Sequence, residues 1–260
     1  MTFAPKVAAL DVDGTLVDES NALSPPVREA VLALAEAGVA IVVATGRAMP
    51  GTMEVVDRLG LHDGIAVSSN GAVVLGYHPV EVLSSVTFDA SEAVRRVLDR
   101  VPDALVAVEE IGIGYRVNAP FPEGEVSGRI TVEDVDSLVS EPVTRVVIRA
   151  PGHDAREFAE VVAGLGLTET NYYIGYTAWL DLAPQGVSKA SGLEMACTRL
   201  DIAPSDVLAI GDGYNDVEML EWAGRGVAMG QAPADVKAVA DDVTGTVAED
   251  GLAAELRRYL

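Results

Sequence analysis

The chain has 260 residues, enough for one large domain or for a core domain with a smaller insert, each with its own buried interior. Apolar residues make up 49% of the sequence and occur in short runs between turn-forming residues, which predicts a soluble globular protein rather than a disordered one. Because 40 acidic residues outnumber 18 basic ones and the formal net charge is -22, most of the surface would repel a phosphate backbone, which argues against nucleic acid as a partner.

The first predicted element is a short buried strand that ends at two carboxylates. Residues 6–10 form an apolar run that is followed by Asp-Val-Asp-Gly-Thr. Aspartates two positions apart on a strand face opposite sides, so Asp11 and Asp13 can share a site only if the chain turns directly after Asp11, which Gly14 permits. One carboxylate could then attack phosphorus while the other transfers protons, although turn or helix-capping aspartates would give the same pattern.

Units of a helix followed by a strand come next. Residues 26–37 have apolar side chains at helical spacing, Gly38 is a stop signal, and residues 39–44 form the next apolar run. Such alternation predicts an α/β fold with a Rossmann-like parallel sheet and helices on both of its faces. The same order recurs at 53–59 with 65–67 and at 188–200 with 207–210.

The middle of the chain breaks this rhythm. Between residues 81 and 183, β-rich stretches alternate with helical ones such as 91–100 and 155–163. This mixture predicts an inserted α+β domain at residues 81–183, within a discontinuous core domain formed by residues 1–80 and 184–260.

Predicted strands of the core end in polar clusters. Ligands of an open parallel sheet bind beyond the carboxyl ends of its strands, so these clusters should converge in space. Oxygen side chains suit Mg²⁺, which Asp11, Asp212 and a backbone carbonyl could hold, although an ordinary acidic turn would look similar. The clusters are residues 11–15, 45–47, 69–71 and 211–216.

Two further groups could bind a phosphate. The hydroxyl and backbone amides of Thr45-Gly46-Arg47 could hold phosphoryl oxygens. Lys189 could neutralise the charge that develops on the phosphoryl group and on Asp11, although a lone lysine is more often a solvated surface residue.

These motifs occur in one order along the chain, each beside a predicted strand. In this order they resemble the haloacid dehalogenase (HAD) superfamily over nearly the whole chain. Asn70-Gly71, the large insert and Gly-Val-Ser-Lys189 are similar to the Cof-type sugar-phosphatase branch, which carries a C2B-type cap. The motifs are Asp11-Val-Asp13-Gly-Thr15, Thr45-Gly46-Arg47, Lys189 and Gly211-Asp212-Gly-Tyr-Asn215-Asp216.

The resemblance implies a magnesium-dependent nucleophilic mechanism. Asp11 would be the nucleophile and a metal ligand. Asp13 would be the acid/base and would offer its backbone carbonyl to the metal, and Asp212 would complete the protein ligands of Mg²⁺. Residues 16–23 would form a flap over the nucleophile, and the 81–183 domain would be a cap that selects the substrate.

The resemblance also implies the groups around the phosphate. Gln231 departs from the family pattern, in which an asparagine often stands here, and is expected at the edge of the site. Asp216 and Asn70 would be supporting residues behind the site. The phosphate-binding residues would be Thr45, Gly46, Lys189 and Asn215.

The sequence therefore predicts a phosphatase that acts on a small phosphorylated metabolite, most plausibly a sugar or polyol phosphate. Phosphoglycolate or pyridoxal phosphate as the substrate, a sugar phosphomutase, and a non-catalytic metal-binding module remain alternatives. The lone Cys197 fits a reducing compartment, and no stretch is long enough to span a bilayer, so we expect a cytoplasmic protein without membrane partners. The sequence does not indicate an oligomeric state.

Overall fold

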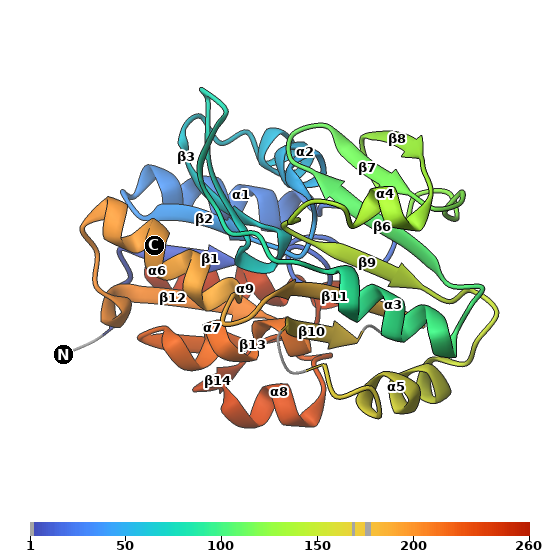
Figure 1. The fold of residues 1–260 in the computed structure, drawn as a ribbon. Coiled ribbons are helices and arrows are strands. Elements are labelled where there is room, and N and C mark those ends of the chain that lie inside the picture. The colour runs from blue at the N-terminus through green and yellow to red at the C-terminus, as the bar shows by residue number, and fades with distance from the viewer. Residues whose placement is uncertain (1–2, 168–169, 175–177) are drawn as a thin grey trace. The chain divides into compact units, whose positions relative to one another are not determined.

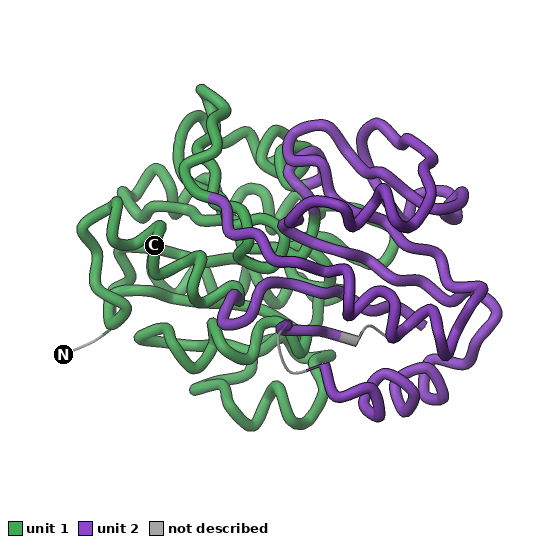
Figure 2. Tube along the Cα trace, viewed as in Figure 1, with its two compact units in different colours: residues 1–47, 52–84, 188–260 green, residues 48–51, 85–187 purple. Residues whose placement is uncertain are grey.

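The computed structural model describes residues 3–167, 170–174 and 178–260. It divides into two compact units (Figure 2). Unit 1 contains the chain up to Arg47 together with Thr52–Ser84 and Ser188–Leu260, and unit 2 contains Ala48–Gly51 and Ser85–Val187. The function of residues 81–183 as a substrate-selecting cap stays a prediction.

Unit 1 is built on a mixed, mainly parallel sheet, which confirms the predicted fold class. All neighbouring pairs from β14 to β3 are parallel. Only η1 (Ser69–Gly71) separates β3 from β4, too short for a parallel crossover, and these two strands pair antiparallel. In sheet order the strands are β14 (Asp242–Val243), β13 (Arg225–Ala228), β12 (Val207–Gly211), β1 (Val7–Leu10), β2 (Ala40–Ala44), β3 (Gly64–Ser68), β4 (Val73–Tyr77) and β5 (Glu81–Ser85).

Helices cover both faces of this sheet (Figure 1). On one face, Val7 and Ala9 of β1 share an apolar cluster with Leu193 and Met219. Because side chains alternate along a strand, Ala8 and Leu10 face the other side of the sheet. Both are fully buried, so a second layer of helices must cover that side. The first layer consists of α6 (Lys189–Leu200), α7 (Val217–Trp222) and α8 (Ala234–Val239), and the second contains α1 (Pro25–Glu36) and α9 (Gly251–Leu256). The remaining helix, α2 (Met49–Leu59), connects β2 to β3.

The strand register brings the polar clusters to one edge of the sheet. Leu10, the last residue of β1, pairs with Ile210 on one side and with Val43 on the other. Ala44 at the end of β2 pairs in turn with Val67. The residues that follow β12, β1, β2 and β3 therefore lie side by side, where ligands of parallel sheets bind.

Unit 2 is an α+β unit with a sheet of its own. Neighbouring strands pair antiparallel except β7 and β8, which are parallel. Val94 and Phe158 from its helices pack on Val106, Ile148 and Leu180 of the sheet. In sheet order the strands are β10 (Thr170–Ile174), β11 (Trp179–Pro184), β9 (Val146–Arg149), β6 (Leu105–Glu110), β7 (Gly114–Val117) and β8 (Arg129–Val132); the helices are α3 (Ser91–Arg100), α4 (Val135–Leu138) and α5 (Ala155–Ala163).

None of the helices in the described part of the chain combines the length and the apolar character that crossing a membrane requires.

Gly71 fixes the approach of the turn after β3 to the start of α6, and this yields a stability prediction. Gly71 and Gly38 both have positive φ, +100° and +91°, but a Cβ at Gly71 would lie 2.0 Å from the Ser188 carbonyl oxygen, whereas none of the atoms described lies within 4 Å of a Cβ at Gly38. We expect Gly38→Ala to cost about 1–2 kcal/mol through its backbone conformation. Gly71→Ala should cost about 1–3 kcal/mol more because of the collision. Urea unfolding of both variants checks this, and equal losses would contradict the predicted steric role.

Candidate active site

Lys189 is a fully buried ammonium group between two carboxylates. It is the first residue of α6, and its Nζ donates hydrogen bonds of 2.6 Å to Asp11 Oδ1 and to Asp216 Oδ1. Burial alone would lower the pKa of Lys189, but the negative charges of Asp11 and Asp216 outweigh it and raise that pKa above its ordinary value. Lys189 is therefore a fixed positive charge inside the site and not a solvated surface residue.

Asp216 supports the loop that follows β12. Its Oδ2 accepts hydrogen bonds from the backbone amides of Asp212 at 2.9 Å and Gly213 at 2.8 Å, while its Oδ1 accepts from Lys189. A Cβ at Gly211 would lie 2.4 Å from the Asp216 carboxylate carbon, so this close approach requires glycine. Both oxygens of Asp216 are thus occupied in holding the loop and the lysine.

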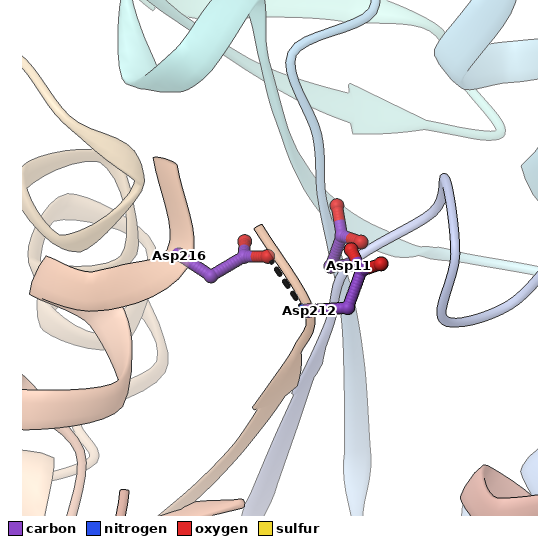
Figure 3. A group of neighbouring side chains, drawn as sticks. All are labelled: Asp11, Asp212 and Asp216. Atoms are coloured by element: carbon purple, nitrogen blue, oxygen red, sulfur yellow. Dashed lines mark hydrogen bonds between the residues drawn. The ribbon is translucent and has the colours of Figure 1, made fainter. Parts of the chain in front are cut away.

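Asp11, Asp212 and Asp216 form an acidic cluster that could hold a divalent metal ion (Figure 3). Each offers a carboxylate oxygen, and these three oxygens lie within 4.8 Å of one another. Within the described part of the chain, Asp11 Oδ2 is buried without a hydrogen-bond partner. Such an orphaned acceptor is costly unless a cation or water pairs with it. The residues present therefore fit a divalent cation.

The pKa values of the carboxyl groups in this cluster reflect an excess of negative charge. Burial, followed by the charge of Asp216, raises the pKa of Asp11 well above its usual range despite the opposing effect of Lys189. The same two causes raise the pKa of Asp212 to about 6. Lys189 contacts two of the three clustered carboxylates and Asp212 adds a third, so negative charge is in excess, and a divalent cation would neutralise it.

The second aspartate of the first motif lies apart from this buried cluster. The chain turns after Asp11 through backbone hydrogen bonds from Thr15, Leu16 and Val17 to the Val12 carbonyl. The side chain of Asp13 is 60% exposed and forms an ion pair with Arg47, in which Nη2 lies 2.5 Å from Oδ1 and Nε lies 3.0 Å from Oδ2.

Gly14 makes this turn possible next to the acidic cluster. Its φ is +86°, and a Cβ would lie 2.1 Å from Asp212 Oδ2. The turn after β1 therefore comes against the loop after β12, and Gly14 is required both for its backbone conformation and for this approach.

The remaining predicted residues meet at the ends of β2 and β3. Thr45 is buried, and its Oγ1 accepts a hydrogen bond from the Arg47 amide at 3.0 Å. Asn70 has a left-handed φ of 53°. Its Oδ1 accepts a hydrogen bond of 3.0 Å from Asn215 Nδ2, and its backbone amide donates to the Thr45 carbonyl. A Cβ at Gly46 would lie 3.0 Å from Asn70 Oδ1. Asn70 thus links the β2 end to the loop after β12.

No side-chain contact was predicted for Arg47, which was named only for its backbone amide, or for Gln231, which was expected only at the edge of the site. Arg47 pairs with Asp13 and donates a further hydrogen bond of 2.9 Å to Asn21. Gln231 donates to Asp212 Oδ2 at 3.2 Å. An arginine at a strand end of an acidic chain is a signal that could have indicated the side-chain contact of Arg47, whereas the expected place of Gln231 at the edge of the site does not identify its partners.

Comparison with known protein families identifies the family to which the chain belongs. The model of the haloacid dehalogenase-like hydrolase family matches residues 8–256. The chain belongs to this family.

Relatives of this HAD-like hydrolase cover nearly all of it. The 5-amino-6-(5-phospho-D-ribitylamino)uracil phosphatase YitU of Bacillus subtilis (strain 168) is 28% identical over 277 residues, 100% of this chain and 99% of that protein. A phosphoglycolate phosphatase of Natronomonas pharaonis is 30% identical over 250 residues, 96% of either chain. The structure of the HAD subclass IIB sugar phosphatase BT4131 has a TM-score of 0.81 at 25% identity, over 97% of this chain and 98% of that one.

These matches confirm the predicted resemblance to Cof-type HAD phosphatases. The relatives are named phosphatases, and the HAD-like hydrolase described here is an enzyme of that class. The individual roles predicted for the site residues remain proposals.

The raised pKa of Asp212 predicts how pH affects the stability of the metal-free enzyme. A carboxyl group whose pKa is about 6 when folded and 3.8 otherwise binds protons more tightly in the folded state. Its contribution to stability is therefore present below pH 4 and is lost as the pH rises to about 6. We expect this loss to be on the order of 2 kcal/mol and to disappear in Asp212→Asn. Urea unfolding in EDTA at pH 4.5 and pH 7 measures it, and an unchanged pH dependence in the variant would refute the assignment.

Proposed function

We propose that this HAD phosphatase hydrolyses a small phosphomonoester, a sugar or polyol phosphate, with Mg²⁺ and through an aspartyl-phosphate on Asp11. The observation that carries the proposal is the environment of Asp11. Its carboxylate is buried, one oxygen is held by Lys189 at 2.6 Å, and the other has no hydrogen-bond partner among the described residues. A carboxylate fixed in this way at the end of a parallel strand is suited to attack a bound phosphate.

In the first half of the proposed reaction, an Asp11 oxygen attacks phosphorus and the ester bond to the leaving oxygen breaks. Lys189 balances the charge that builds on Asp11 and on the phosphoryl oxygens. The leaving oxygen takes a proton from Asp13, which is close to the surface and can exchange protons with water. The other proposed phosphoryl contacts are the Thr45 hydroxyl, the Gly46 amide and the Asn215 side chain.

In the second half, water attacks the phosphorus of the aspartyl-phosphate and gives its proton to Asp13. The bond between phosphorus and Asp11 breaks, which releases phosphate and restores the Asp11 carboxylate and the protonated carboxyl group of Asp13. Mg²⁺ would be held by Asp11, Asp212 and the Asp13 backbone carbonyl, where it would stabilise negative charge on the phosphoryl oxygens. Asp216 and Asn70 support these groups from behind.

The sugar or polyol class is supported by the relatives and not by the described site, which accounts only for the phosphate. YitU is named for a substrate with a phosphorylated ribityl chain, and BT4131 is named a sugar phosphatase. Phosphoglycolate is the next candidate, because the relative of Natronomonas pharaonis is named for it. Selection among them would be made by residues 81–183, the proposed cap.

The first test is phosphate release from sugar, polyol, two-carbon and cofactor phosphates, with Mg²⁺ or with EDTA. We expect release to require Mg²⁺ and to fall about 10³-fold or more in Asp11→Asn, because the nucleophile is lost. Asp99→Asn, the same change at an exposed position on α3, is the matched control and should keep full activity. Isomerised product with little free phosphate would instead indicate a phosphomutase, and no turnover of any substrate would favour a metal-binding module.

The role of Asp13 can be tested separately through the leaving group. An alkyl alcohol must receive a proton as it leaves, whereas p-nitrophenolate leaves without one. We therefore expect Asp13→Asn to lower kcat/KM about 10²–10⁴-fold for an alkyl phosphate and much less for p-nitrophenyl phosphate. Steady-state kinetics on the two substrates decide this, since equal losses would show that Asp13 does not protonate the leaving group.

A further inference from the structure

The side chain of Gln231 joins three separate segments of unit 1. Its Nε2 donates one hydrogen bond of 2.6 Å to the Gly14 carbonyl in the turn after β1 and another of 3.2 Å to Asp212 Oδ2 in the loop after β12. Its Oε1 accepts a hydrogen bond of 3.1 Å from the Val247 amide. The amide group therefore uses both of its N–H donors and its carbonyl oxygen.

The orientation of this amide is settled by its neighbours. The Gly14 carbonyl and the Asp212 carboxylate accept hydrogen bonds, so the NH₂ group of Gln231 must face them, and the Val247 N–H must face the oxygen. A flipped amide would bring oxygen against oxygen on one side and N–H against N–H on the other. The side-chain amide of Gln231 thus satisfies Gly14, Asp212 and Val247 in one orientation only.

The backbone that carries Gln231 is anchored on both sides. The Met229 amide donates to the Gly211 carbonyl at 2.9 Å, directly before Asp212. The Gly230 amide donates to the Gly245 carbonyl at 2.9 Å, and Lys237 Nζ donates to the Gly230 carbonyl at 2.5 Å. The side chain starts from a fixed point, although Gln231 itself is exposed at the surface.

We propose that Gln231 is a positioning residue for the metal site, which sets the Asp212 carboxylate and holds the turn after β1 beside the loop after β12. This inference rests on the proposed function, since it takes Asp212 to be a metal ligand. Groups that hydrogen-bond to a ligating carboxylate fix its orientation, and their removal commonly lowers metal affinity 10- to 100-fold.

Without Gln231, Asp212 would lose the one side-chain donor that the described residues offer it, and it would lie among carboxylates that repel it. The Gly14 carbonyl would at the same time lose its link to the opposite loop. Both changes leave the buried core intact, because the side chain of Gln231 is at the surface. The expected defect is weaker metal binding in a protein that still folds.

Binding of Mn²⁺ alone, measured from the electron paramagnetic resonance signal of the free ion, tests the proposal without turnover. We expect Gln231→Met, which keeps the length of the side chain but loses its hydrogen bonds, to raise the Kd for Mn²⁺ about 10- to 100-fold. Gln231→Asn is the second variant: it keeps the amide, but one methylene fewer prevents it from spanning Val247 and the Gly14–Asp212 pair, so Kd should rise as well. Gln185→Met, the same change at an exposed glutamine of unit 2, should bind Mn²⁺ like wild type.

The outcomes separate this inference from the proposed function. Asp212→Asn should abolish Mn²⁺ binding; wild-type affinity in that variant, or no binding by wild type, would overturn the metal site itself. If Asp212→Asn loses binding while both Gln231 variants bind like wild type, the positioning role alone is overturned. Thermal unfolding in EDTA provides the control for folding, because Gln231→Met should unfold there like wild type and show a smaller rise in Tm on addition of Mn²⁺.

Discussion

The site depends on one buried interaction, the contact of the Lys189 ammonium with Asp11 and Asp216. These partners are 178 and 27 residues away in the sequence, so the contact ties the end of β1, the start of α6 and the loop after β12 to one point. Removal of one member of a buried ion pair commonly costs about 3–5 kcal/mol, because the remaining charge stays buried without compensation. The same contact therefore holds these three segments together and keeps Lys189 positively charged.

The same interaction leaves negative charge uncompensated. A divalent cation that neutralised this charge would allow an acidic chain to bind an anionic substrate. Lys189 is shared between two carboxylates, and Asp212 adds a third. In the absence of a metal ion, burial and mutual repulsion raise the pKa of Asp11, which disfavours the ionised form that a nucleophile needs. A divalent cation would both ionise Asp11 and attract phosphate locally, against a net charge of -22 over the whole chain.

Much of the fold could be predicted because periodic patterns report on local structure. Helices at 91–100 and 155–163 coincide with α3 and α5, and the polar clusters lie at the strand ends as parallel topology requires. The burial of Lys189 could not be predicted, since it depends on two carboxylates distant in sequence. The contacts of Arg47 and Gln231 were missed for the same reason: each is a side-chain contact between loops, and no local pattern encodes it.

The structure also gives the two aspartates of the first motif different surroundings, although they are only two positions apart. Asp11 is 4% exposed and bound to a permanent cation, so its charge is governed by the interior of the protein. Asp13 has a side chain that is 60% exposed and pairs with Arg47 at the surface, where protons can be exchanged with water. Two carboxyl groups in different environments can take different parts in one reaction, attack for the buried group and proton transfer for the exposed one.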